Sequence, residues 1–217
     1  MHIERVCGSA TELVSQPFPE VLPTALVQVF GLSRTALILG SGQKESIADL
    51  PAAEAAGVDV ARRRSGGGAV LLAPGRSLWI DVLLPRDDPR WSDDVVASSE
   101  WLGDTWAAAL RVLGVAATVH HGGLQKTRWG RLVCFGALGP SEVVIGGRKV
   151  VGISQRRTRV GARFQCLVHD DWDPGALLDL LVLDPPDRAQ ALVELADLAA
   201  GPGVPLADLE QAFLACL

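Results

Sequence analysis

The sequence predicts an α+β fold in which a mixed, hairpin-rich β-sheet is flanked by helices. Short apolar stretches that alternate with polar residues, such as residues 77–84, favour strands. The Gly146-Gly147 pair between two such stretches indicates a tight hairpin. Residues 92–113 differ, because their apolar positions recur at helical spacing. Both periodicities in one chain, without a regular strand–helix alternation, are typical of the α+β class.

The first half of the chain carries the longest expected helix. Residues 9–30 hint at a helix, but three prolines interrupt them. Strands are expected at residues 35–39, 58–60 and 77–84, and helices at residues 45–56 and 92–113. The strands are short apolar runs next to turn residues. Gly57 and Gly114 follow the two helices, and glycine is the usual residue just past a helix end.

The second half alternates short strands with turns before it becomes helical. Strands are expected at residues 115–119, 132–135, 142–145, 149–153 and 164–168, and helices at residues 177–181, 188–198 and 205–217. Asp173-Pro174 marks the change to helical spacing. We expect residues 1–217 to form one domain, with residues 174–217 as its helical C-terminal part.

Composition and charge exclude several classes of function. The 217 residues are 48% apolar and carry a net charge of −5, so no general attraction to nucleic acid or to a membrane is expected. The four cysteines lack a C-x-x-C pair, which predicts neither a metal site nor a disulfide framework. The N-terminus lacks a basic start followed by an apolar run, so the expected location is cytoplasmic.

A glycine run is the first chemically informative motif. It consists of Arg62, Arg63, Arg64, Ser65, Gly66, Gly67, Gly68, Ala69 and Val70. Without Cβ atoms, its main chain can lie directly against a ligand and point N–H groups at it. The arginines add donors suited to phosphate or carboxylate. Alone, the run is equally consistent with a glycine-rich hairpin and solvated arginines.

A lysine run is the second motif. It consists of Gly146, Gly147, Arg148, Lys149, Val150, Val151, Gly152, Ile153, Ser154 and Gln155. Lys149 stands between a glycine hairpin and an apolar strand, where it could stabilise charge developing at a carbonyl or phosphorus centre. Gly152 and Ser154 would allow a long, thin substrate to approach closely. Taken alone, Lys149 fits a surface hairpin better than a functional site.

Together the two runs resemble the lipoate-protein ligase and octanoyltransferase superfamily. Arg-Arg-x-Ser-Gly-Gly-Gly-Ala-Val is followed by Gly-x-Lys-Val-x-Gly-x-x-Gln, and Gly40-Ser41-Gly42-Gln43 is similar to the family's early Gly-x-x-Gln turn. The resemblance covers residues 36–173. It implies a biotin/lipoate protein ligase type of catalytic domain with Lys149 as its essential lysine. The implied acyl- and nucleotide-binding residues are Gln43, Arg62, Arg63, Ser65, Gly66, Gly67, Gly68, Ala69, Gly152, Ser154 and Gln155.

The resemblance leaves two reactions open. In the ligases, lipoic or octanoic acid reacts with ATP and Mg²⁺ as co-substrates, and a lysine of a lipoyl-domain protein attacks the acyl adenylate. Such carriers include the glycine cleavage H protein and the E2 component of 2-oxoacid dehydrogenases. One octanoyltransferase branch carries a Cys-Phe pair like Cys134-Phe135. There the cysteine would form an acyl thioester from octanoyl-acyl carrier protein, without ATP or another cofactor.

Two places depart from the family's pattern. Leu71-Leu72-Ala73 stands where the family has a polar pair with histidine, and Gln165-Cys166-Leu167 stands where it has His-Gly after the glutamine. These losses motivate a third hypothesis, a catalytically silent protein that binds an acyl group or a nucleotide.

Overall fold

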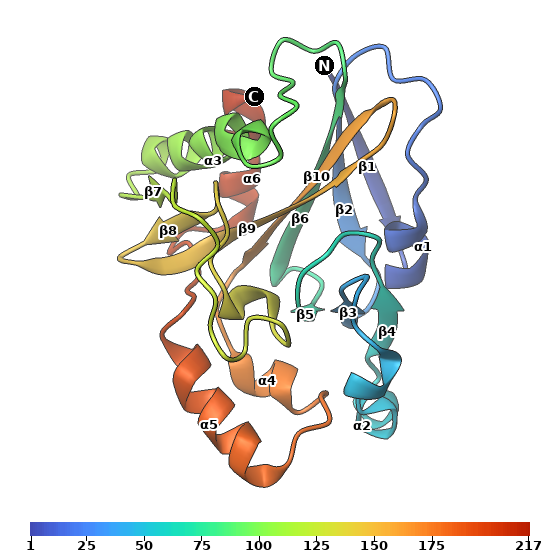
Figure 1. Ribbon diagram of the computed structural model, residues 1–217, viewed down its shortest axis with the longest axis vertical. Helices are drawn as coiled ribbons and strands as arrows, with labels where there is room; N and C mark the ends of the chain where they lie inside the picture. Colours follow the sequence, from blue (N-terminus) through green and yellow to red (C-terminus); the bar gives the residue numbers. More distant parts are fainter.

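Two β-sheets form the centre of the molecule, and the computed structural model describes all residues from Met1 to Leu217 (Figure 1). The large sheet has seven strands in the order β1-β2-β6-β10-β9-β8-β7. Their bounds are His2–Gly8 for β1, Leu26–Leu32 for β2, Ser77–Pro85 for β6, Thr118–Val119 for β7, Val143–Ile145 for β8, Arg148–Arg157 for β9 and Gly161–His169 for β10. The small sheet has the order β4-β3-β5, with Asp59–Arg62 as β4, Ala36–Leu39 as β3 and Val70–Leu72 as β5.

The pairing of the strands is mostly antiparallel. Only β1 with β2, and β3 with β4, run parallel. The predicted mixed, hairpin-rich sheet is therefore confirmed, including the hairpin at Gly146-Gly147 between β8 and β9. Both of those glycines have positive φ, which the tight turn needs.

Six α-helices surround the sheets. They are α1 (Ala10–Ser15), α2 (Leu50–Ala55), α3 (Glu100–Val112), α4 (Pro174–Leu178), α5 (Pro185–Ala196) and α6 (Leu206–Cys216). Asp49, Asp173 and Asp184 cap α2, α4 and α5 by accepting hydrogen bonds from main-chain N–H groups of the first turn. None of the helices is long and apolar enough to cross a bilayer.

The helices α3 and α6 pack together over one face of the large sheet (Figure 1). Trp106 of α3 stacks on Phe213 of α6 with ring centroids 3.8 Å apart, and both side chains are fully buried. Both side chains belong to the largest core cluster, which joins α3 and α6 to apolar residues of β2, β6, β9 and β10. The small sheet packs on the opposite face, where Ile38 and Leu72 meet Trp79.

Strand β10 contributes to both sides of the large sheet. Phe164 and Val168 belong to the core under α3 and α6. Gln165 and Leu167 instead line a pocket shared with the small sheet. This follows from the period-two geometry of a strand, in which successive side chains point to opposite faces. The alternation of β10 therefore directs Phe164 and Val168 to the core and Gln165 and Leu167 to the pocket, while Cys166 belongs to both.

Residues 132–135 do not form the strand that the sequence predicts. Cys134–Gly136 form a 3-10 turn, and the residues before it run beside the glycine run. The N–H of Ala69 donates to Leu132 O at 2.7 Å, and the N–H of Cys134 donates to Ala69 O at 3.0 Å. Residues 132–135 are apolar because they are buried or half-buried in a loop, not because they belong to the large sheet.

Two predicted helices begin later than expected. The segment expected as a helix at 45–56 starts with a 3-10 turn at Glu45–Ile47, and α2 begins at Leu50 after the capping residue Asp49. The segment expected at 92–113 becomes α-helical only at Glu100. Strands β1, β2 and β5 were not among the predicted elements; β1 is half exposed, and its edge position weakens the apolar pattern.

Candidate functional site

The glycine run lies so close to its neighbours that side chains would not fit. A Cβ on Gly68 would come within 2.5 Å of Val133 C, and a Cβ on Gly40 would come within 1.9 Å of Gly67 O. Gly67 also has a φ of 98°, which disfavours other residues. The glycines therefore bring the run against the loop that contains Cys134.

Buried polar side chains hold the glycine run in place. Arg63 is only 7% exposed, and its guanidinium donates to the carbonyls of Gly66, Gly68 and Ile38. Ser65 is buried, and its Oγ donates to Gln165 Oε1 at 2.5 Å. The main-chain N–H groups of the three glycines donate to no protein acceptor, so they remain available to a ligand.

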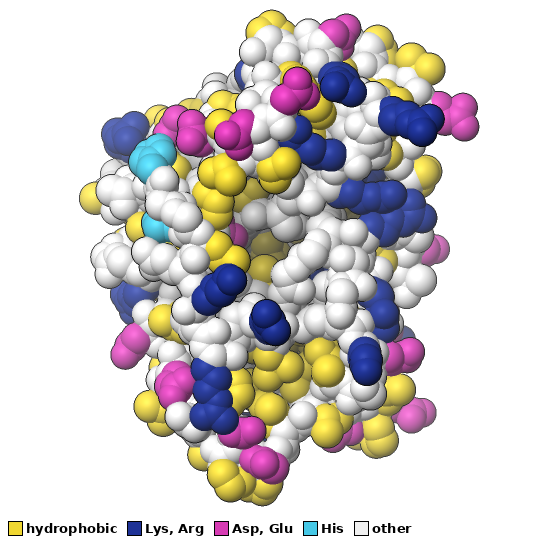
Figure 2. Space-filling view, in the orientation of Figure 1, with side chains coloured by type: hydrophobic (Ala, Val, Ile, Leu, Met, Phe, Trp, Pro, Cys, Tyr) yellow, Lys and Arg dark blue, Asp and Glu magenta, His cyan; other side chains and the backbone are white.

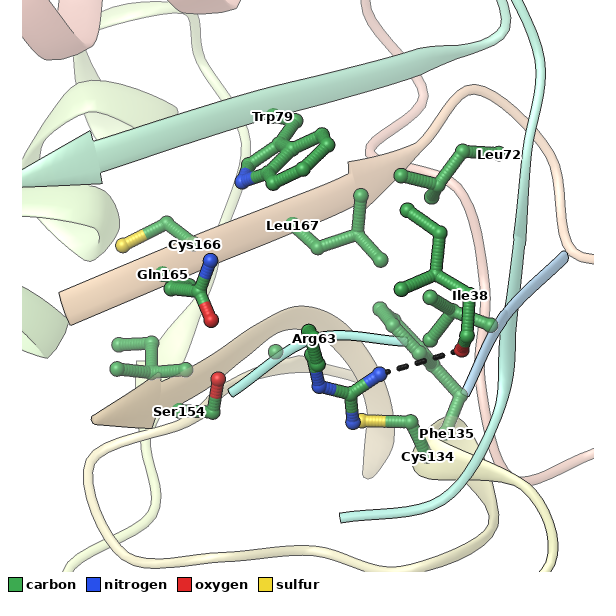
Figure 3. A pocket seen from close by; sticks show the side chains of 13 residues that line it. Ile38, Arg63, Leu72, Trp79, Cys134, Phe135, Ser154, Gln165, Cys166 and Leu167 are labelled. Atoms are coloured by element: carbon green, nitrogen blue, oxygen red, sulfur yellow. Dashed lines mark hydrogen bonds between the residues drawn. The ribbon is translucent and has the colours of Figure 1, made fainter. Parts of the chain in front are cut away.

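A narrow apolar pocket lies between the large sheet and the small sheet (Figure 3). Its volume is about 50 Å³, which corresponds to a file of roughly four water-sized groups. Trp79 and Leu167 come from the large sheet, and Ile38 and Leu72 from the small sheet. In Figure 3 these four side chains gather at one end of the pocket. Such a space suits an extended aliphatic chain.

A wide polar cleft of about 780 Å³ adjoins the apolar pocket. The glycine run lines one part of it, and residues of the 124–131 loop line another. Cys134, Ile153 and Ser154 line both the pocket and the cleft. Cys134 is half-buried and carries a free thiol. Its sulfur therefore lies where an apolar chain in the pocket would meet a polar group in the cleft.

Lys149 also lines the cleft, and it forms a buried ion pair there. Its Nζ lies 2.7 Å from Glu142 Oε1, and the two side chains are 3% and 6% exposed. Nζ also donates to the main-chain carbonyls of Cys134 at 3.1 Å and Ala137 at 3.2 Å. Glu142 in turn accepts from the N–H of Gly139. The pair thus fixes the main chain on both sides of the Cys134 turn.

A second buried polar network supports the wall of the pocket. Asp81 accepts hydrogen bonds from Trp79 Nε1 at 2.7 Å and from Gln165 Nε2 at 3.3 Å. Arg163 Nη1 lies 3.5 Å from Asp81 Oδ2. Burial raises the pKa of Asp81 to about 7, and the nearby Arg163 guanidinium opposes that rise. The network orients Gln165 so that its carbonyl faces Ser65.

His169 is buried behind the Lys149 ion pair. The His169 ring meets the Phe135 ring at a centroid distance of 4.7 Å, and Lys149 Nζ lies 4.7 Å from the same Phe135 ring. Burial, assisted by the Lys149 charge, lowers the pKa of His169 to about 4. The ring is therefore neutral at pH 7, and its Nε2 has no hydrogen-bond partner.

Most of the binding residues predicted from the sequence come together around the pocket and the cleft. Those that line one or both are Gln43, Arg63, Gly66, Gly67, Gly68, Gly152, Ser154, Gln155, Cys134 and Lys149. Ser65 lies behind the pocket wall and accepts a hydrogen bond from Ser154. Ala69 is fully buried beside Val133. Arg62 is exposed on β4 and lines neither space.

Two of these residues hold loops through hydrogen bonds. Gln43 accepts from the N–H of Gly40 and donates to the carbonyls of Arg131 and Leu132. Gln155 donates to the carbonyl of Val95 in the segment before α3. Both amides therefore contribute to the shape of the cleft.

Sequence reasoning missed Glu142, Gln165 and the cations of the 124–131 loop. Glu142 carried a usable signal, because it is a lone carboxylate beside the apolar run Val143–Ile145, next to a hairpin that bears a lone lysine. Gln165 lies between two buried apolar residues of a strand, which also hints at a polar pocket. Lys126 and Arg131 gave no such signal, since exposed loop cations are common.

Comparison with known proteins identifies the family. The family model described as the lipoyl protein ligase A/B catalytic domain matches residues 26–215. An octanoyltransferase LipM from Exiguobacterium sp. is 27% identical over 158 residues, which are 70% of this chain and 56% of the relative. An octanoyltransferase LipM from Kyrpidia tusciae is 29% identical over 197 residues, 84% of this chain and 70% of the relative. The chain thus matches little more than half of the Exiguobacterium relative.

Solved structures show the same fold. A bi-partite lipoate protein ligase from Thermoplasma acidophilum superposes with a TM-score of 0.76 at 18% identity, covering 99% of this chain and 81% of that one. A lipoate-protein ligase A bound with ATP superposes with a TM-score of 0.69 at 18% identity, covering 99% and 83%. Since the family model also spans most of the sequence, the chain belongs to the lipoyl protein ligase A/B catalytic-domain family.

Proposed function

We propose that this protein is an acyltransferase that attaches a medium-chain acyl group to a lysine of a lipoyl-domain protein, with Cys134 as the nucleophile. The position of Cys134 supports this most directly, because it lines both the apolar pocket and the polar cleft. An acyl chain in the pocket would place its carbonyl carbon beside the thiol. The cleft would admit first the acyl donor and then the acceptor lysine.

The reaction has two balanced steps. The Cys134 thiolate attacks the carbonyl carbon of an octanoyl thioester, and the donor leaves as a free thiol after taking up a proton. The uncharged ε-amine of the acceptor lysine then attacks the Cys134 thioester. An amide forms, the C–S bond breaks, and the amine proton returns to the Cys134 sulfur. Each step exchanges one acyl bond for another, so no nucleotide is needed to drive it.

The Lys149 ammonium positions the reacting residue, because its three N–H groups bond to Glu142 and to the carbonyls of Cys134 and Ala137. A different feature of the cleft suits the negative charge that develops on the acyl oxygen. The N–H groups of Gly66 and Gly67 lack protein acceptors and belong to residues of the cleft wall. Preorganised donors of this kind stabilise an oxyanion without having to reorganise. The two relatives described above, both octanoyltransferases LipM, favour the same reaction.

An ATP-dependent lipoate ligase is the second candidate. The volume of the cleft favours it, because about 780 Å³ lies within the range of sites for ligands of nucleotide size. In that reaction Lys149 and the glycine run would face the acyl phosphate, Mg²⁺ would arrive with the nucleotide, and Cys134 would have no covalent role. The acceptor in both reactions would be a lipoyl-domain protein of the H-protein or E2 type.

Intact mass of a purified lipoyl domain distinguishes the two candidates. The domain is incubated with this protein and either octanoyl-acyl carrier protein without ATP, or octanoic acid with ATP and Mg²⁺. Wild type, Cys134→Ser and Cys216→Ser are compared, since Cys216 is also half-buried but lies at the end of α6. We expect the octanoyl group to move from the carrier protein to the lipoyl domain, and wild type to carry an octanoyl adduct of its own. Cys134→Ser should lose the transfer and the adduct, whereas Cys216→Ser should keep both.

The opposite pattern overturns the proposal. Modification that requires ATP and persists in Cys134→Ser would establish the ligase reaction. No modification with either donor, although octanoate or its thioester binds, would favour the silent binding protein.

A further inference from the structure

The polar cleft carries a surplus of positive charge in an acidic protein. Its charged lining residues are Lys126, Arg128, Arg131, Glu142 and Lys149. Lys149 is paired with Glu142, and Arg128 is paired with Asp187. Lys126 and Arg131 have no carboxylate within 4.0 Å, although acidic residues outnumber Lys and Arg by 25 to 20 in the chain. Figure 2 shows Lys and Arg side chains beside the hollow on this face.

The loop that carries the two unpaired cations is held firmly. Gln125 exchanges two main-chain hydrogen bonds with Leu138, and Thr127 Oγ1 donates to Gly136 O at 2.5 Å. Gln43 holds the other end of the loop through the carbonyl of Arg131.

Two neighbours anchor the middle of the loop to α5. Arg128 bonds to Asp187 and Gln190 and lies over the Trp129 ring at 4.5 Å. The Trp129 indole N–H donates to Glu194 at 2.6 Å. Lys126 and Arg131 are therefore long, exposed side chains on a fixed support at the cleft, rather than cations of a loose surface loop.

We infer that Lys126 and Arg131 form an anion-binding rim that recognises a phosphate ester on the acyl donor. This rests on the proposed function, because the donor must bring its thioester to Cys134 through this cleft. An acyl carrier presents its acyl group on a pantetheine arm that ends in a phosphate ester, with the whole length of the arm between the phosphate and the thioester. Arg and Lys are the side chains that bind phosphate oxygens best. In an acyl adenylate the phosphate is bonded to the acyl group itself, so it would lie at Lys149 and the glycine run rather than at the rim.

Binding measurements test the rim without requiring transfer. Isothermal titration calorimetry of S-octanoyl-pantetheine and S-octanoyl-4′-phosphopantetheine with Cys134→Ser compares two ligands that differ only in the phosphate. The background prevents turnover during the titration. Lys126→Gln, Arg131→Gln and the double variant are made in it, with Arg111→Gln as control. Arg111 is exposed on α3 without an acidic partner and does not line the cleft.

We expect the phosphorylated ligand to bind on the order of tenfold more tightly, as for a hydrogen bond to a charged group. The double variant should abolish this difference and leave S-octanoyl-pantetheine binding unchanged, whereas Arg111→Gln should preserve it. Added salt should shrink the difference. Equal binding of the two ligands to the parent protein, or equal weakening of both by the variants, overturns the inference.

A third ligand, octanoyl-AMP, shows which kind of phosphate the rim binds. The rim would be assigned to an adenylate if Lys126→Gln and Arg131→Gln weakened the binding of octanoyl-AMP while the parent protein bound the two pantetheine compounds equally. Acylation of wild-type Cys134 by S-octanoyl-pantetheine is followed separately by mass. Its absence would defeat the proposed transfer while the binding comparison still decides the inference.

Discussion

Replacing Lys149 by methionine should destabilise the fold as well as stop catalysis. The substitution leaves Glu142 charged, 6% exposed and without its cation, and it removes the donor to the carbonyls of Cys134 and Ala137. Breaking a buried ion pair by removing one partner costs about 3–5 kcal/mol. For a chain of this size each kcal/mol lowers the Tm by about 2–4 °C, so the expected fall is about 6–20 °C.

Urea unfolding measures this loss, followed by both circular dichroism and tryptophan fluorescence to check two-state behaviour. Lys149→Met with Glu142→Gln should be more stable than Lys149→Met alone, because no unpaired charge remains buried. Arg148→Met, at the exposed neighbouring position, serves as the control. The reasoning is refuted if Lys149→Met unfolds within about 1 kcal/mol of wild type, a typical surface-substitution effect. Activity lost in that case would be chemical alone.

Two further substitutions test the pocket and its polar network. Leu167→Ala should open the apolar end of the pocket toward Leu72 and let longer chains bury more methylenes, each adding about 0.8 kcal/mol, or roughly fourfold. The ratio of kcat/KM for decanoyl to octanoyl donors should therefore rise about 15-fold, and an unchanged ratio would contradict this role of Leu167. Asp81 has a pKa of about 7 instead of its usual 3.8, so the native state binds the extra proton and wild type loses stability as the pH rises between those values. Asp81→Asn removes that dependence, so the free energy of unfolding of the variant relative to wild type should increase from about pH 4 to pH 7. Urea unfolding at several pH values measures this difference. A constant difference across that range would show that Asp81 is not protonated in the folded protein.

The glycine and lysine runs were predictable as a site because local chemistry defines them. Three glycines in a row have few structural uses, and the close approach at Gly68 confirms one of them. What could not be predicted was the partner of each polar group. Ser65 meets Gln165 across one hundred residues of sequence, and Gln43 reaches the Arg131 carbonyl across eighty-eight. Such pairings depend on the packing of the two sheets, which periodicity alone does not specify.

The secondary structure also divides into elements that local sequence patterns predict and elements that tertiary contacts decide. The strand with clean alternation, β6, matched its predicted position closely, whereas β10 contains the predicted residues 164–168 but begins three residues earlier. The prediction of a strand at residues 132–135 was wrong, because an apolar run is compatible both with a strand and with a buried loop. Its place was decided by the main-chain bonds to Ala69, a tertiary contact that no local pattern records.

The alternation of β10 constrains how this protein can change over evolutionary time. Odd-numbered positions from Arg163 to Leu167 supply the pocket and its network, while Phe164 and Val168 supply the core under α3 and α6. A one-residue deletion in the Thr158–Gly161 turn that shifted the pairing with β9 by one residue would exchange the two sets at once. Insertions should therefore be tolerated between β6 and α3 but not in this turn. The core-facing and pocket-facing residues of β10 can change only one at a time, by substitution, and not by a change in the length of the turn.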